Sequence, residues 1–147
     1  MSTQGSKAVV SRLYEEVFGH WDFGVLDELI GADFIGHGTP PGTPAGPAGV
    51  KQFYTGMRSA FPDIRYTVDD LVAEDDKVVV RWTWRGTHQG EYSGIPATGR
   101  QVAVTGIAIY RVRGGKCVER WVAVNLLGLL RQLGAMLPDT GHPGARS

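Results

Sequence analysis

Cysteine is almost absent from this sequence of 147 residues: Cys117 stands alone, so no disulfide can form within the chain. An excess of either charge is absent too, because 15 Lys and Arg residues balance 15 Asp and Glu residues. Such a chain has no net field that would attract nucleic acid or an anionic membrane. No run approaches the roughly 18 apolar residues of a membrane-spanning helix, and residues 1–7 are polar. We therefore expect a cytoplasmic protein without nucleic-acid or membrane partners.

Motifs for metals and nucleotides are missing as well. His, Cys and carboxylate residues do not occur at the spacings of known metal sites, and neither GxGxxG nor GxxxxGK[ST] is present. Cys117 lies in an apolar strand pattern next to Val118, which favours a packing role over nucleophilic chemistry. We therefore expect no metal site.

Glycine and proline, by contrast, are plentiful, with 21 and 8 residues that cluster in two runs, 36–49 and 138–147. The first run is too long for a tight turn and predicts a mobile loop. The second predicts a flexible C-terminus, and residues 1–6 are expected to be flexible at the other end. No internal repeat is present, and the length fits a single domain over residues 1–147.

Apolar residues recur at helical spacing in three early segments, 8–18, 22–29 and 50–61. Asp22 is a typical N-cap residue for the second segment, and Pro62 ends the third. A brief extended segment is expected over residues 34–37.

The rest of the chain shows the patterns typical of strands. Residues 64–73 and 78–88 form one predicted hairpin, and residues 101–113 and 116–124 form another around the turn Gly114-Gly115. A last apolar helix is expected over residues 126–133. Helices followed by long strands predict an α+β fold, with helices on one face of a curved antiparallel sheet.

The second hairpin predicts a ligand cavity, because its register follows from counting outward from the turn. The predicted pairs that share one face are Trp121 with Ala108, Ala123 with Gly106, Asn125 with Val104, and Glu119 with Tyr110. Small residues beside an aromatic wall leave space under the helices, which is how an apolar pocket is built. Alternatively, the small residues merely make room for helix side chains.

The opposite face of the same hairpin is also apolar. Its predicted members are Ile107, Ile109, Val118, Val122 and Val124. A flat aliphatic face suits packing against a second copy of the sheet, so we expect a homodimer formed through these sheet faces.

The first hairpin predicts a charged pair. Counting from its acidic turn places Asp70 opposite Arg81 and Asp69 opposite Trp82. An unpaired charge in the middle of a strand is costly, so the pair is either a structural ion pair or a dyad in the pocket.

Four motifs together resemble one known family. The chain carries FPD at 61–63, GTH at 86–88, GK…E.W at 115–121 and LLRQLG at 129–134. From the first helix to about Gly134 the sequence resembles the SnoaL-like polyketide cyclases of the NTF2-like superfamily. The resemblance implies an NTF2-like cone, or α+β barrel, whose N-terminal helices enclose an apolar pocket. It also implies a role in the biosynthesis of aromatic polyketide antibiotics such as anthracyclines, without metal or organic cofactor.

The chain departs from this family at Asn125. The family's cyclases close a ring by aldol chemistry with an Asp that lies four residues after the Trp of GK…E.W, and Asn cannot transfer a proton near neutral pH. Other members of the family are associated with hydroxylation of the polycyclic skeleton, which is therefore our leading expectation. The alternatives are an aldol cyclase that uses another base, and a non-catalytic small-molecule binding protein or partner subunit.

The candidate residues fall into two groups. Candidate catalytic residues, which would orient or deprotonate an aromatic polyketide substrate, are Asn125, His37, Asp69, Asp70 and Arg81. Candidate substrate-binding residues, which are expected around the pocket, are Phe34, Tyr54, Met57, Phe61, Trp82, His88, Gly106, Ala108, Trp121 and Ala123. Plainer roles stay open for several of them: His37 could cap the loop, His88 could be a structural histidine, and the large apolar residues could be ordinary core.

Overall fold

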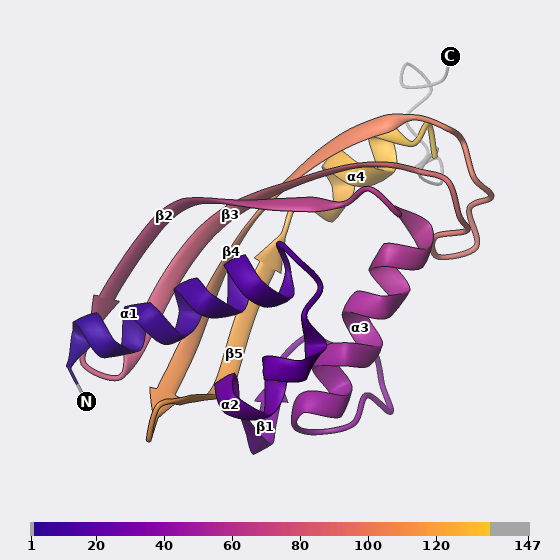
Figure 1. The fold of residues 1–147 in the computed structure, drawn as a ribbon. Helices are drawn as coiled ribbons and strands as arrows, with labels where there is room; N and C mark the ends of the chain where they lie inside the picture. Colours follow the sequence, from indigo (N-terminus) through magenta and orange to yellow (C-terminus); the bar gives the residue numbers. More distant parts are fainter. Residues whose placement is uncertain (1, 136–147) are drawn as a thin grey trace, which may run out of the picture.

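The computed structural model describes residues 2–135, so the tail expected at 138–147 lies outside the described residues. A curved five-stranded sheet wraps around helices that cover its inner face (Figure 1). The helical segments are α1 (Thr3–Arg12), the π-helix η1 (Leu13–Val17), the 3-10 helix η2 (Phe23–Val25), α2 (Leu26–Leu29), α3 (Pro47–Ala60) and α4 (Leu126–Gln132). The strands are β1 (Ile30–Gly36), β2 (Arg65–Glu74), β3 (Lys77–Thr87), β4 (Gln101–Arg113) and β5 (Lys116–Val124). No helix within residues 2–135 is long and apolar enough to cross a membrane.

The first helix begins earlier than its apolar stripe predicts. Ser2 caps α1 by accepting a hydrogen bond from the backbone N–H of Gly5 at 3.0 Å, and Ser6 is buried. Residues 3–6 thus belong to the helix, because a polar cap can start a helix ahead of the first apolar residue, and the flexibility expected of residues 1–6 stays a prediction.

The sheet is mixed rather than purely antiparallel. Strands β2 to β5 form the predicted antiparallel meander, and β1 adds a parallel edge strand to β5, which gives the order β1-β5-β4-β3-β2. The segment 37–46 then leads from β1 to α3, so the predicted Gly/Pro loop loses its first residue to a strand and its last three to a helix. Its mobility stays a prediction.

The β4–β5 register differs from the predicted one by a single residue. Val112 pairs with Cys117, but Arg111 pairs with Glu119, so Val118 is the extra residue of a β-bulge. Beyond the bulge the pairs are Gly106 with Val124, Ala108 with Val122, and Tyr110 with Arg120.

This shift exchanges the two faces of β5, because successive side chains of a strand point to opposite sides. Trp121 and Ala123 lie on the outer face beside Ile109 and Ile107, not on the inner face as predicted. Val122 and Val124 lie on the inner face with Arg120, so the predicted membership of the outer apolar face is wrong for both valines.

A smaller irregularity affects β2. Asp70 pairs with Arg81 as predicted, but Val68, and not Asp69, pairs with Trp82. The residue between them bulges out of the ladder, which a count from the turn cannot anticipate.

The core lies between the inner face of the sheet and the helices. The ring of Trp82 lies against Gly106, so a larger residue is excluded there: its Cβ would overlap the indole. The small residue therefore makes room for a side chain, but for one of the neighbouring strand β3 and not, as the plainer alternative had it, for one of a helix. Cys117 is fully buried, and burial raises the pKa of its thiol to about 12, as suits a packing residue.

Candidate functional site

A cavity of about 420 Å³, here called the main cavity, opens between the inner face of the sheet and helices α3 and α4. The sheet contributes Tyr66, Trp82, Trp84, Arg120, Val122 and Val124. The helices contribute Phe53, Tyr54, Met57, Leu126 and Leu129. Gly38, Thr39, Pro40 and Tyr92 complete the lining from two connecting segments. A cavity of this size with mostly aromatic and aliphatic walls suits a flat apolar molecule.

The aromatic wall is tightly packed, which keeps its shape fixed. The ring centroids of Tyr66 and Trp82 lie 5.4 Å apart, and those of Tyr54 and Tyr66 lie 5.9 Å apart, both in edge-to-face geometry. Phe18 of the segment after η1 stacks on Tyr54 with the centroids 4.0 Å apart. The tyrosine on α3 is therefore held from both sides.

Arg120 is the one charged side chain among the described residues that line the main cavity. It is 7% exposed, and its Nε has no hydrogen-bond partner within residues 2–135. Burial by itself lowers the pKa of Arg120, but the oxygens of Tyr54 and Tyr110 outweigh that effect and raise it. The cavity therefore holds a permanent, buried and incompletely paired positive charge.

Buried tyrosines surround this charge. The hydroxyls of Tyr14 and Tyr110 lie 3.0 Å apart, and burial raises the pKa of both, as it does for Tyr54 and Tyr66. These phenols stay protonated at neutral pH, so none of them neutralises the guanidinium of Arg120.

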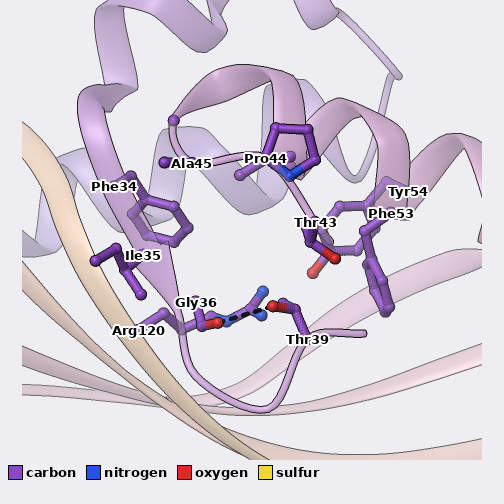
Figure 2. A pocket seen from close by; sticks show the side chains of 13 residues that line it. Phe34, Ile35, Gly36, Thr39, Thr43, Pro44, Ala45, Phe53, Tyr54 and Arg120 are labelled. Atoms are coloured by element: carbon purple, nitrogen blue, oxygen red, sulfur yellow. Dashed lines mark hydrogen bonds between the residues drawn. The ribbon is translucent and has the colours of Figure 1, made fainter. Parts of the chain in front are cut away.

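A second pocket of about 100 Å³, here called the side pocket, lies between β1, the 37–46 connection and α3 (Figure 2). It shares Thr39, Phe53, Tyr54 and Arg120 with the main cavity. The guanidinium of Arg120 fits there because the neighbouring strand has a glycine: a Cβ at Gly36 would lie 2.8 Å from Nη2 of Arg120.

The predicted substrate-binding residues separate into groups. Tyr54, Met57 and Trp82 line the main cavity, and Phe34 lines the side pocket. Phe61 packs behind the cavity wall, with its ring 4.8 Å from that of Trp84. Gly106, Ala108, Trp121 and Ala123 do not line either cavity, the last two because of the bulge in β5.

His88 is a buried structural residue in this arrangement. Its Nδ1 accepts a hydrogen bond from the backbone N–H of Thr98 at 3.2 Å, so the ring proton resides on Nε2 when the ring is neutral. Nε2 is buried without a partner within the described part of the chain, and His88 lines neither the main cavity nor the side pocket.

His37 lies on the outer face and not at the cavity. Its Nε2 is 2.7 Å from a carboxylate oxygen of Glu119, and its ring stacks on Trp121 with the centroids 5.3 Å apart. This placement follows from the register of β5, which turns both partners outward.

Asp69, Asp70 and Arg81 lie together on the surface, where the carboxylate nearest to Arg81 is that of Asp69 and not that of Asp70. Asp69 accepts a hydrogen bond from the hydroxyl of Thr83 at 2.6 Å and lies 3.9 Å from Arg81. Asp70 accepts from the backbone N–H of Leu71 at 3.1 Å. All three side chains are exposed or half-buried on the outer face, so they make no dyad in the cavity.

Asn125 caps a helix and lines neither the main cavity nor the side pocket. Its Oδ1 accepts a hydrogen bond from the backbone N–H of Gly128 at 3.0 Å, and its own N–H donates to the carbonyl of Thr105 at 3.0 Å. The residue is exposed, but it fixes the start of α4, which carries Leu126 and Leu129 into the cavity wall.

Sequence reasoning missed Arg120, Tyr66, Trp84 and Tyr92 as cavity residues. A signal for Arg120 was present, since it is a strong cation inside an apolar strand, but the assumed register turned it outward. Within residues 2–135 no three His, Cys, Asp or Glu side chains lie close enough together to hold a metal ion.

The curved sheet and the enclosed cavity define an NTF2-like α+β cone, as predicted. Residues 8–133 match the family model described as SnoaL-like polyketide cyclase, and the chain belongs to this family. A search among curated proteins gave no match.

Several solved structures are similar to this chain along most of its length. TsrD from Streptomyces laurentii is 30% identical, with a TM-score of 0.84, over 92% of this chain and 99% of its own. IdmH from Streptomyces antibioticus, described as "a putative polyketide cyclase", is 36% identical, with a TM-score of 0.77, over 88% of this chain and 98% of its own. AclR from Streptomyces galilaeus, described as "a putative hydroxylase", is 30% identical, with a TM-score of 0.78, over 95% of this chain and 86% of its own.

Proposed function

We propose that this protein hydroxylates an aromatic polyketide of the anthracycline type, which it binds in the main cavity as an oxyanion beside Arg120. The observation that carries the proposal is a buried guanidinium, whose Nε has no partner within residues 2–135, in a cavity whose other walls are mostly aromatic and aliphatic. A planar polycyclic phenol matches both features, because its rings fill the apolar space and its oxygen accepts from Arg120.

The cation makes the bound phenol easier to ionise. A guanidinium beside a phenol oxygen in a poorly solvated site lowers the pKa of that phenol, so the anion forms near neutral pH with solvent as proton acceptor. The electron-rich anion of a hydroquinone then reacts with dioxygen. One oxygen atom enters the ring and the other leaves as water, while the two electrons come from oxidation of the hydroquinone to the quinone.

The similar proteins support this class of reaction. The family is one of polyketide cyclases, and a neighbour with 30% identity is described as "a putative hydroxylase". The replacement at Asn125 no longer contributes to the choice, because that side chain lies outside both cavities.

Ring closure is the second candidate, and the protonated hydroxyls of Tyr54 and Tyr66 in the main cavity favour it. An enolate would be stabilised by Arg120 as a phenolate is, and a tyrosine could protonate the new alkoxide. The neighbour described as "a putative polyketide cyclase" is 36% identical to this chain.

The experiment is incubation with candidate polyketide intermediates, in reduced form and under ¹⁸O₂, followed by mass spectrometry. A product that gains one labelled oxygen supports hydroxylation, an isomeric or dehydrated product supports ring closure, and binding without turnover supports a binding protein. Arg120→Gln should lower kcat/KM on the order of 10²- to 10³-fold, as the loss of one preorganised oxyanion donor does elsewhere. Arg65→Gln, which alters an exposed arginine outside the cavity, is the matched control.

A further inference from the structure

The side pocket is a distinct compartment behind Arg120. Figure 2 shows the guanidinium at its floor, between Gly36 and Thr39, with the hydroxyls of Thr43 and Tyr54 directed toward the same space. The remaining walls are apolar and come from β1, the 37–46 connection and α3. At about 100 Å³, the pocket has room for roughly three water-sized groups.

The positive charge of Arg120 has no negative counter-charge among the described residues that line the side pocket. Arg120 is the one charged side chain among the described residues that line the side pocket, as it is for the main cavity. Its side chain is more than nine-tenths buried, and Nε has no partner within residues 2–135. A buried, unpaired cation is costly, and the missing counter-charge is what a bound anion would supply.

We propose that the side pocket binds a carboxylate of the substrate, so that the natural substrate is an aromatic polyketide acid rather than an ester. This inference rests on the proposed function for the position of the aromatic rings in the main cavity. One carbon and two oxygens match the room available, and a planar carboxylate pairs with the guanidinium fork through two parallel N–H···O bonds. The guanidinium has five N–H donors, so some remain for the phenol oxygen in the main cavity, and the single positive charge is then shared between the carboxylate and that oxygen.

The position of the guanidinium depends on Gly36. Because a Cβ at this residue would lie 2.8 Å from Nη2 of Arg120, alanine there pushes the end of a flexible side chain and leaves the backbone in place. Gly36→Ala therefore keeps the charge and moves its donors, while Arg120→Gln removes the charge itself. Gly56→Ala on α3, where a Cβ meets nothing within 4 Å, is the matched control.

The test compares anthraquinone-2-carboxylic acid with its methyl ester and with unsubstituted anthraquinone, using quenching of Trp82 and Trp84 fluorescence in the cavity wall. Wild type and Gly56→Ala should bind the acid at least about tenfold more tightly than the ester, which corresponds to about 1.4 kcal/mol. In Arg120→Gln and Gly36→Ala this preference should fall to within about twofold, while the affinity for unsubstituted anthraquinone is kept. Circular dichroism and thermal melting check that each variant is folded.

The outcomes separate this inference from the proposed function. If the ester binds as tightly as the acid in wild type, the carboxylate assignment is overturned, although the aromatic cavity stands. If Gly36→Ala keeps the full preference for the acid, the assignment to the side pocket is overturned even where Arg120→Gln does not fold. If none of the three probes binds, the aromatic cavity and the carboxylate assignment are both wrong.

Discussion

A single residue, Arg120, gives the main cavity its charge, while two of the predicted catalytic residues, Asn125 and His37, lie outside both cavities. The guanidinium is buried with Nε unpartnered in the described part of the chain, whereas Asn125 caps α4 and His37 lies on the outer face beside Glu119. A position in a motif therefore gives the residue type, but the side of the sheet on which the side chain lies decides its role.

Substitutions at Asn125 distinguish a cap from a substrate contact. Asn125→Asp keeps an oxygen that accepts from the N–H of Gly128 at the start of α4, so stability and activity should stay near those of wild type. Asn125→Ala removes the acceptor and should destabilise the protein by about 1 kcal/mol. Thermal melting and an activity assay on the same three proteins provide the measurement. A large loss of activity in a stable Asp variant would show that the residue contacts the substrate.

At the scale of elements, the bounds of the strands follow closely from local signals. The turn Gly114-Gly115 and the apolar pattern around it predicted β4 and β5 as Gln101–Arg113 and Lys116–Val124, and the structure has the same limits. The register failed because Val118 is unpaired, and a bulge arises from the contacts of two strands rather than from any residue type along one of them.

The cavity residues that were predicted correctly are those whose orientation does not depend on the β4–β5 register. Tyr54 and Met57 on α3 and Trp82 on β3 were predicted and line the main cavity, and their contact with a substrate stays a prediction. Residues beyond the bulge were assigned to the wrong face. The parallel strand β1 was predicted only as the short segment 34–37, because a strand at the sheet edge carries a weak alternation of its own.

Asp63, just before β2, is hydrogen-bonded to Thr87 at the end of β3, and we expect the strength of this link to depend on pH. Its carboxylate accepts from the hydroxyl of Thr87 at 2.7 Å and from the backbone N–H of the same residue at 2.6 Å, and these bonds lower the pKa of Asp63. A carboxyl whose folded-state pKa is lowered contributes stability above its ordinary pKa and loses that contribution as the pH falls through the folded-state value.

Asp63→Asn should therefore melt at a lower temperature than wild type at pH 7, and the difference should shrink as the pH is lowered to about 3. Melting curves of both proteins across this range provide the measurement, with Asp33→Asn on β1, which makes no side-chain hydrogen bond in the described structure, as a control. A difference in melting temperature that does not change with pH would contradict the role of the carboxylate charge.

At the scale of the whole molecule, the outer face of the sheet carries exposed apolar side chains, interspersed with charged ones, that the single chain leaves uncovered. Ile107 is 48% exposed and Val72 is 54% exposed, and register places Ile109 and Ala123 on the same face. We propose that two copies pack through this face, since an exposed aliphatic sheet surface of this kind is typical of an isologous dimer.

Ile107→Asp should convert a dimer into a monomer, because each introduced carboxylate would lose its solvation in the interface. Sedimentation velocity of wild type and variant provides the measurement. Ala48→Asp, an exposed position on α3 away from this face, should leave the sedimentation coefficient unchanged. A wild-type protein that sediments as a monomer at high concentration, or an Ile107→Asp dimer, would contradict the proposal.

The bulge at Val118 also has a consequence for evolution. One extra residue decides whether the side chains that follow it in β5 point into the cavity or out of it. Loss of this codon would restore a regular ladder and keep Arg120 opposite Tyr110, whereas a chain of the same length that pairs without the bulge would present a tryptophan where this one presents the arginine. Relatives that share the motif GK…E.W can thus present different side chains to their ligands, so an alignment of this family should be judged by sheet face as well as by residue match.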